Sequence, residues 1–213
     1  MHGYSDRINH ALAFAAKYYG LASGPERTMA YLAHPANIAI ILARYGCEDL
    51  TVVAGILHRV LEEAAPRERE ELEAKVLEKF GPVVLATACE VLEPRHDALG
   101  RLRAWRTCKR EFLIQIADAE PRGLDICAAD ELHNCGAAIR VVRRLGAEYL
   151  HASPDASPAD TLWWYGAITD HLDSRREWRN RAMLEELQAM TRELAVLLQL
   201  ERRRSEDAPR RRR

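Results

Sequence analysis

The stretch Thr51-Val-Val-Ala-Gly-Ile-Leu-His58-Arg59-Val-Leu-Glu62-Glu63 decides the fold class of this 213-residue chain. Its apolar residues recur at intervals of three and four, which is the spacing of one face of an α-helix. The pattern predicts a helix over about residues 50–63, with Asp49 as its N-cap. It also sets an imidazole and a carboxylate, His58 and Glu62, on the same side of that helix.

Helical periodicity continues on both sides of this stretch, and we find no convincing strand. Gly20, Gly46 and Gly146 each follow a periodic run, where a glycine ends a helix well. The expected helices cover about residues 6–19, 33–45, 50–63, 67–79, 83–91, 99–119, 122–145, 159–172 and 175–203. The sequence therefore predicts an all-α helical bundle that forms a single domain over residues 1–200.

Composition narrows the class of protein further. A net charge of −1 gives no overall field that would recruit nucleic acid or a membrane. No apolar run is long enough to span a bilayer, and the N-terminus lacks the regions of a signal peptide. The five cysteines are scattered without a CxxC pair. We therefore expect free thiols in a reducing cytoplasm, with no membrane partner and with homo-oligomerisation left open.

The C-terminal residues 201–213 differ from the rest of the chain. They contain seven arginines and three acids, and few apolar residues. A segment of this kind has little to bury, so we expect disorder over 201–213. A solvated tail is the preferred interpretation, and contact with nucleic acid or a membrane surface is the alternative.

Three residues on different predicted helices are candidate metal ligands, namely His34, His58 and Asp130. A helical bundle can bring such residues together in its core. Two imidazoles and a carboxylate suit manganese, iron or zinc, and Glu62 or Glu63 would orient or deprotonate an attacking water. In the structural alternative, His34 caps a helix, His58 edges the core and Asp130 pairs with an arginine. The acids would then pair with Arg59, which precedes Glu63 by one helical turn.

Several motifs follow one another in a particular order. They are Tyr31-Leu-Ala-His34-Pro35, Thr51-Val-Val-Ala-Gly-Ile-Leu-His58, Lys79-Phe-Gly-Pro-Val-Val84, Trp105-Arg-Thr-Cys-Lys109, Ala129-Asp-Glu-Leu-His-Asn134 and Leu162-Trp-Trp-Tyr165. In order, spacing and content over about residues 6–172, they resemble the hydrolase domain of RelA/SpoT-type alarmone enzymes and their small stand-alone relatives. Those enzymes belong to the HD-domain phosphohydrolases.

The resemblance implies an all-helical HD fold and a manganese-dependent reaction, the removal of 3′-pyrophosphate from guanosine tetra- or pentaphosphate. By the same resemblance, the metal ligands fall on His34, His58 and Asp130. The acidic pair that acts on the attacking water falls on Glu62 and Glu63.

Substrate contacts also follow from the resemblance. Asn134 falls on a residue that lines the nucleotide site, and Tyr31 falls near the base. Arg27 is close to the position of the family's base-contacting arginine but is shifted from it. Lys109 lies on a basic helix, where it either contacts phosphate or faces solvent.

Arg59 is the main departure from the family pattern, because it stands where the fourth metal ligand, an aspartate, is expected. A guanidinium stays protonated and has no lone pair to give a metal. We therefore expect weak metal binding or none, with an Arg59–Asp130 ion pair as a substitute for the metal. Arg59 is also a candidate substrate contact. Glu131, Cys127 and Gly136 replace residues that are basic in many relatives, so phosphate contacts are thinned.

Two classes of function follow from these observations. The first is a cytoplasmic phosphohydrolase of a nucleotide or another phosphorylated small molecule, with an altered manganese site. The second is a metal-free HD protein that binds a nucleotide or a partner as a sensor, or that runs a repurposed reaction with acid–base residues alone.

Overall fold

The chain is all-α in its computed structural model, which describes residues 5–23, 25–97, 99–150 and 154–207. The only bridge between extended residues in these ranges joins His96 and Leu102. The elements are α1 (Asp6–Ser23), α2 (Pro25–Arg44), α3 (Asp49–Glu63), α4 (Pro66–Phe80), α5 (Pro82–Glu90), α6 (Trp105–Gln115), a 3-10 turn (Ile116–Asp118), α7 (Pro121–Leu145), a second 3-10 turn (Ala147–Tyr149), α8 (Pro158–Ser174) and α9 (Arg181–Asp207). The all-α prediction is confirmed.

Helix α3 is the centre of the N-terminal half, where it packs against α1, α2, α5 and α7. Most of its residues are buried, which matches the apolar run that the sequence shows. Gly55 lets α2 approach closely, because a Cβ atom there would lie 2.5 Å from Leu42 Cδ1. The packing of α2 on α3 brings the helix that carries His34 against the helix that carries His58.

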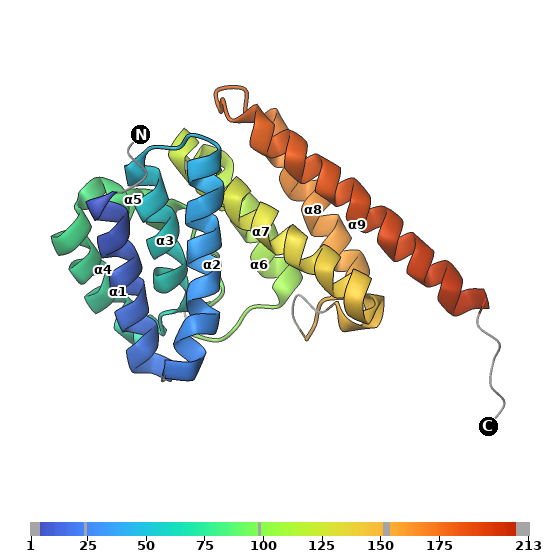
Figure 1. The fold of residues 1–213 in the computed structure, drawn as a ribbon, viewed down its shortest axis with the longest axis horizontal. Helices are drawn as coiled ribbons and strands as arrows, with labels where there is room; N and C mark the ends of the chain where they lie inside the picture. The colour runs from blue at the N-terminus through green and yellow to red at the C-terminus, as the bar shows by residue number, and fades with distance from the viewer. Residues whose placement is uncertain (1–4, 24, 98, 151–153, 208–213) are drawn as a thin grey trace.

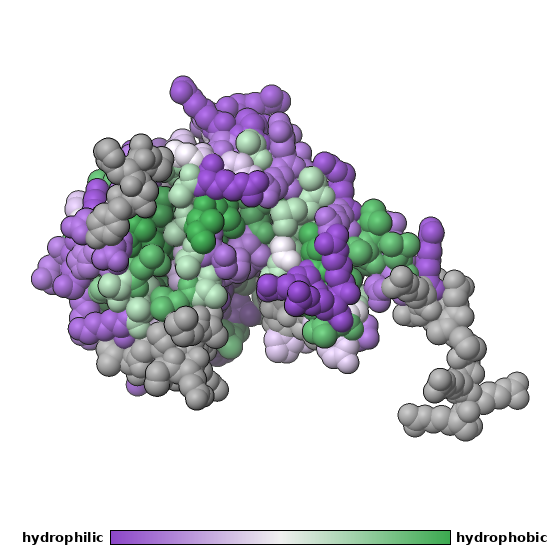
Figure 2. All heavy atoms as spheres, in the orientation of Figure 1, coloured by the Kyte–Doolittle hydropathy of each residue, from purple (hydrophilic) through white to green (hydrophobic). Residues whose placement is uncertain are grey.

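Helix α7 joins the two halves of the molecule. Figure 1 shows it between the group α1–α5 and the helices α8 and α9, and it contacts α2, α3 and α5 as well as α8 and α9. Trp178 holds the C-terminal helices to α7, because its Nε1 donates to Asp125 Oδ1 at 2.9 Å and its side chain is almost fully buried. Figure 2 shows that the surface is hollowed between the two halves. Over the described residues, no helix has the length and apolarity that a membrane crossing requires.

The ends of the first two helices differ from the prediction. Helix α1 continues through Gly20 to Ser23, since one interior glycine costs only about 1 kcal/mol, which packing against α2 and α3 can offset. Helix α2 begins at Pro25, a residue suited to the first turn, and not near Ala33. Asp49 is not the N-cap of α3; Glu48 holds that position, and Asp49 instead accepts a hydrogen bond from Ser5 Oγ.

Two predicted helices are shorter than expected. Residues 99–104 are not helical. The Asp97 carboxylate accepts hydrogen bonds from the backbone N–H groups of Leu99 and Arg101, which turns the chain. In addition, Gly100 has a φ of 73°, which does not fit a helix. Residues 175–180 connect α8 and α9 without a helix. Their side chains hold this connection in place, since the Arg175 guanidinium donates to the carbonyls of Ile116 and Ala119.

The last helix is longer than predicted. Helix α9 runs to Asp207, past the expected end at about residue 203, and the disorder expected for the tail stays a prediction. Glutamate and arginine are good helix formers, and extending an existing helix is far easier than starting one. The remaining residues of the tail, 208–213, lie outside the described residues.

Candidate functional site

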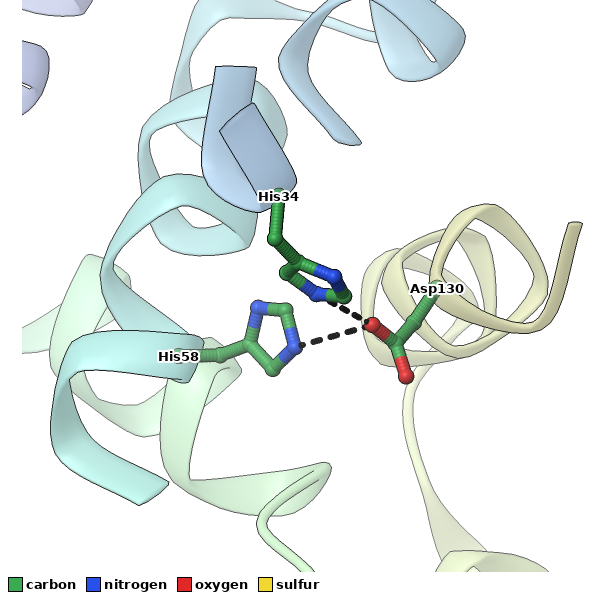
Figure 3. A group of neighbouring side chains, drawn as sticks. All are labelled: His34, His58 and Asp130. Atoms are coloured by element: carbon green, nitrogen blue, oxygen red, sulfur yellow. Dashed lines mark ion pairs between the residues drawn. The ribbon is translucent and has the colours of Figure 1, made fainter. Parts of the chain in front are cut away.

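The three candidate metal ligands meet at one point of the helical bundle (Figure 3). His34 comes from α2, His58 from α3 and Asp130 from α7, and one ligand atom of each lies within 4.8 Å of the other two. His34 Nε2 is 2.7 Å from Asp130 Oδ1, and His58 Nε2 is 3.8 Å from the same oxygen. Residues far apart in the sequence therefore converge as the sequence predicted. The structural alternative that His34 caps a helix is wrong, because His34 lies inside α2.

Hydrogen bonds around this cluster fix the orientation of its side chains. His58 is only 3% exposed, and its Nδ1 lies 2.5 Å from the Gly55 carbonyl oxygen. With a proton on Nδ1 donated to that carbonyl, the ring would present its Nε2 lone pair toward Asp130, as a metal-binding histidine does. Asn134 Nδ2 donates to Asp130 Oδ2 at 2.9 Å, so the other carboxylate oxygen is turned toward the histidines. These contacts hold the three ligand atoms ready for a shared partner.

Charge inside the cluster is strongly coupled. Burial would raise the pKa of Asp130, but the nearby His34 and His58 outweigh it and hold that pKa well below its usual range. Burial would lower the pKa of His58, but Asp130 and Glu62 raise it above its ordinary value. A negative carboxylate thus lies between two imidazoles, which is the charge arrangement that a bound cation would also favour.

The residues present fit a divalent cation. His34 Nε2 and His58 Nε2 lie 2.7 Å and 3.8 Å from Asp130 Oδ1, so three donor atoms that can each bind a cation share one small space. Two imidazoles and one carboxylate form a common ligand set for manganese, iron or zinc, and three protein ligands leave positions open for substrate.

Arg59 does not pair with Asp130, so that prediction is wrong for the described residues. Its Nη1 lies 2.7 Å from Glu62 Oε2 and its Nε lies 2.7 Å from Glu63 Oε1. Both acids are one turn further along α3, and a side chain finds such partners more readily than one on another helix. The pairing of Arg59 with Glu63, which the spacing allowed, is confirmed. The guanidinium is therefore turned toward these acids and not into the histidine–aspartate cluster.

Glu62 is held by three donors. Besides Arg59, Arg95 Nη2 donates to Oε2 at 2.8 Å, and the backbone N–H of Glu93 donates to Oε1 at 3.1 Å. Its side chain is almost fully buried. A carboxylate fixed in this way is suited to orienting a neighbouring group, because three donors hold its two oxygens in place.

A cleft of about 850 Å³ adjoins the histidine–aspartate cluster, a volume suited to a small-molecule ligand. Its lining includes Arg59, Glu62, Lys109, Asp130 and Asn134, so five of the residues predicted for the site share one cleft. Glu63 is not among the described residues that line the cleft; it contacts Arg59, which does line it.

Lys109 is buried in the wall of this cleft, at 8% exposure, and does not face solvent. Its Nζ contacts the Glu93 carboxylate, lies 3.8 Å from Glu131 Oε1, and is 4.1 Å from the centre of the Trp164 ring. Trp164 Nε1 donates to Glu131 at 2.9 Å. Burial raises the pKa of Glu131 to about 7, although Lys109 acts in the opposite direction. These contacts hold the Lys109 ammonium group in place beside the histidine–aspartate cluster.

Other predicted residues lie elsewhere or outside the description. The side chains of Arg27 and Tyr31 are outside the described residues, so their predicted contacts with the base stay predictions. Arg106 is not in the cleft lining; it pairs with Asp160 and stacks over Trp163, with its Cζ 4.2 Å from the ring centre. His133 packs edge-on against His34, with ring centres 4.6 Å apart.

Sequence reasoning missed the loop between α5 and α6, which contributes Glu93, Arg95 and Arg103 to the cleft. Arg103 donates from Nε to the His96 carbonyl and pairs with Glu111. The signal was visible as a basic segment after the apolar helix, where Arg101 and Arg103 alternate with Leu102 and Ala104 and Arg95 lies a few residues before them. Its contacts with α3 are long-range, and local periodicity carries no information about them.

Comparison with known proteins agrees with this geometry. Residues 11–105 match a family model described as HD domain. The fold is similar to that of the Listeria monocytogenes EGD-e protein lmo0812, with 19% identity, a TM-score of 0.61, and coverage of 76% of this chain and 94% of that one. It is also similar to a metazoan ortholog of SpoT that hydrolyses ppGpp, with 20% identity, a TM-score of 0.63, and coverage of 91% and 98% respectively. No curated protein matches the chain.

Proposed function

Because this chain belongs to the HD-domain superfamily, we propose that it is a phosphohydrolase that uses a divalent cation held by His34, His58 and Asp130. One observation carries the proposal. Three ligand atoms from three helices lie within 4.8 Å of one another at the edge of a cleft large enough for a nucleotide. The metal is manganese by the family resemblance, and the ligand set also suits iron or zinc.

Arg59 modifies this centre without occupying it. At the position expected for a fourth ligand stands Arg59, whose guanidinium forms ion pairs with Glu62 and Glu63. We expect three ligands to bind metal more weakly than four, because one favourable contact is lost and a positive charge stays nearby. The proposed enzyme is therefore one that requires added metal for full occupancy.

A bound cation would polarise a phosphate oxygen and lower the pKa of an attacking water. The remaining steps depend on side chains of the cleft. Glu62, fixed by two arginines and a backbone N–H, would orient the water, while Glu63 holds Arg59 in place. The Arg59 nitrogen that Glu62 and Glu63 leave free would donate to the phosphate in a cleft that is partly shielded from solvent, and Lys109 would hold Glu93 in place beside it. Asn134 would keep Asp130 aligned through its hydrogen bond.

The competing proposal is a metal-free HD protein that binds a nucleotide or a partner as a sensor, or that runs another reaction. The observation in its favour is Arg59 itself, which supplies a positive charge close to Asp130 without any metal. Metal content separates the two proposals, since only the first requires that the protein bind a divalent cation.

Guanosine 3′,5′-bis(diphosphate) is the substrate that the resemblance predicts, with loss of the 3′-pyrophosphate. The direct test is release of pyrophosphate or phosphate by purified protein with and without manganese. We expect metal-dependent release that falls at least about a hundredfold in Asp130→Asn, as for loss of a key polar group of an active site. Release that is the same in EDTA and in manganese would reject the metal-dependent reading.

Glu62→Gln and Glu71→Gln form a matched pair for this assay. Glu62 lines the cleft, whereas Glu71 lies on α4 with a 75% exposed side chain. Activity should fall in the first variant and stay unchanged in the second. Equal activity of both variants would remove Glu62 from the proposed reaction.

A further inference from the structure

Over the described residues, the charged side chains that line the cleft beside the histidine–aspartate cluster nearly balance one another, and this limits the charge of its ligand. Four of these described residues are cations, namely Arg59, Arg95, Arg103 and Lys109. Five of them are carboxylates, namely Glu62, Glu93, Asp130, Glu131 and Asp155. Without Glu131, the count is four cations and four carboxylates. A cleft that binds a highly charged anion is expected to have a clear excess of cations.

The cations of the cleft already have carboxylate partners. Arg95 pairs through Nε with Glu93 and through Nη2 with Glu62, and Arg59 pairs with Glu62 as well. Lys109 pairs with Glu93. Since each positive charge is largely compensated by the protein, little of it is left to balance phosphate groups of a ligand.

Arg103 completes this pattern, because its Nε and Nη1 are engaged by the His96 carbonyl and the Glu111 carboxylate. In each of the three arginines, two guanidinium nitrogens thus contact oxygen atoms of the protein. Among the described residues, one terminal nitrogen of each is left for a ligand oxygen. That capacity suits one phosphoryl group and is small for two diphosphate groups.

The lining of the cleft also includes large apolar side chains, two of them well exposed. Leu102 is 77% exposed and Tyr149 is 59% exposed, and both line it together with the partly buried Trp105. Large apolar side chains exposed within a concave site are typical of contact with the organic part of a ligand. Trp105 and Tyr149 would stack on a planar ring.

We propose that the substrate of this site is a phosphate monoester with one phosphoryl group and a planar aromatic body, such as a nucleoside monophosphate. The inference rests on the proposed phosphohydrolase function and names its substrate class. One phosphoryl group carries about −1.5 to −2 charges at neutral pH, which one divalent cation and the residual donors can balance. Two diphosphate groups carry at least about four negative charges, which is more than one divalent cation and three remaining guanidinium nitrogens can balance.

The corresponding reaction is the hydrolysis of a phosphomonoester. The oxygen of water forms a bond to phosphorus, and the bond between phosphorus and the ester oxygen breaks. A proton from water passes to the leaving oxygen, so the products are an alcohol and inorganic phosphate, and no other reactant is needed.

Two ligands that share a base and a sugar test the inference: guanosine 3′-monophosphate and guanosine 3′,5′-bis(diphosphate). Binding to the full chain is measured by calorimetry with manganese present, and turnover is measured in parallel. We expect the monophosphate to bind at least about tenfold more tightly, which corresponds to about 1.4 kcal/mol. Tighter binding of the bis(diphosphate), or binding of neither ligand, would overturn the inference. Preferential binding of the monophosphate without turnover would instead overturn the proposed hydrolase function.

Charge variants test the cause of the preference. Glu93→Gln removes one lining carboxylate and should shift the ratio of the two affinities toward the bis(diphosphate) by about tenfold. Asp155→Asn is the second variant, since its amide oxygen can still accept the hydrogen bond from the Trp105 backbone N–H. Glu71→Gln, far more exposed and on α4, is the control. If neither lining variant shifts the ratio further than the control does, the electrostatic argument fails.

Discussion

Replacing Arg59 with aspartate should convert the three-ligand cluster into a four-ligand metal site. The change removes two ion pairs of 2.7 Å, to Glu62 and Glu63, and sets a new carboxylate beside these acids and Asp130. Without metal, the variant therefore has an excess of negative charge at the end of α3. With metal, the same carboxylate supplies the ligand that Arg59 cannot supply.

The size of the effect follows from the contacts that remain. Removing one partner of a buried ion pair costs about 3–5 kcal/mol, but Glu62 keeps Arg95 and a backbone N–H, and Glu63 is partly exposed. We therefore expect Arg59→Asp to lower the free energy of unfolding by about 2–3 kcal/mol in EDTA. Manganese at a hundred times its dissociation constant should restore about 2.7 kcal/mol in the variant, and less in the wild type, where the site is weaker.

Urea unfolding followed by circular dichroism, with EDTA or manganese, measures both numbers. Arg192→Asp on the exposed side of α9 is the control, and its stability should not respond to metal. If manganese stabilises Arg59→Asp no more than the control, the assignment of His34, His58 and Asp130 as ligands is wrong.

Three further predictions concern the scaffold. Trp178→Phe loses the bond to Asp125 and some packing, and should lower the free energy of unfolding by about 2 kcal/mol; a change below about 0.5 kcal/mol would contradict this. Ser157→Ala removes the side-chain cap of α8 and should cost about 1 kcal/mol by the same urea assay, whereas an unchanged midpoint would show that the cap is dispensable. Burial raises the pKa of Asp125, so the stability that its protonated form contributes is present below its ordinary pKa and is lost as pH rises. Asp125→Asn should therefore gain stability relative to wild type between about pH 4 and 7, and a constant difference would contradict the burial argument.

Much of the fold could be predicted because local patterns determine it. Helices α3 and α7 follow directly from their apolar periodicity, and Gly146 ends α7 with a positive φ as a C-cap glycine does. The boundaries that differ are those fixed by single side chains at a distance. The Asp97 carboxylate that turns the chain before α6 and the Arg175 guanidinium that bonds to carbonyls near Ile116 are examples. Such contacts leave no periodic trace in the sequence.

The same distinction between local patterns and distant contacts applies to the candidate site. His34, His58 and Asp130 were found because their motifs resemble those of a family, and the structure brings them together. The direction of Arg59 was not determined by sequence, because Asp130 on another helix and Glu63 one turn away were both possible partners. In the structure, Glu62 and Glu63 pair with the Arg59 guanidinium at N–O distances of 2.7 Å, and Asp130 does not pair with it.

The most direct test of the central claim is a manganese titration of the full chain, followed by electron paramagnetic resonance of free and bound Mn²⁺. We expect the wild type to bind one Mn²⁺ per chain, His58→Ala to bind none, and Arg59→Asp to bind Mn²⁺ more tightly than the wild type. Wild type and His58→Ala that bind manganese equally, or a wild type that binds none even at millimolar metal, would contradict the claim that His34, His58 and Asp130 hold a divalent cation.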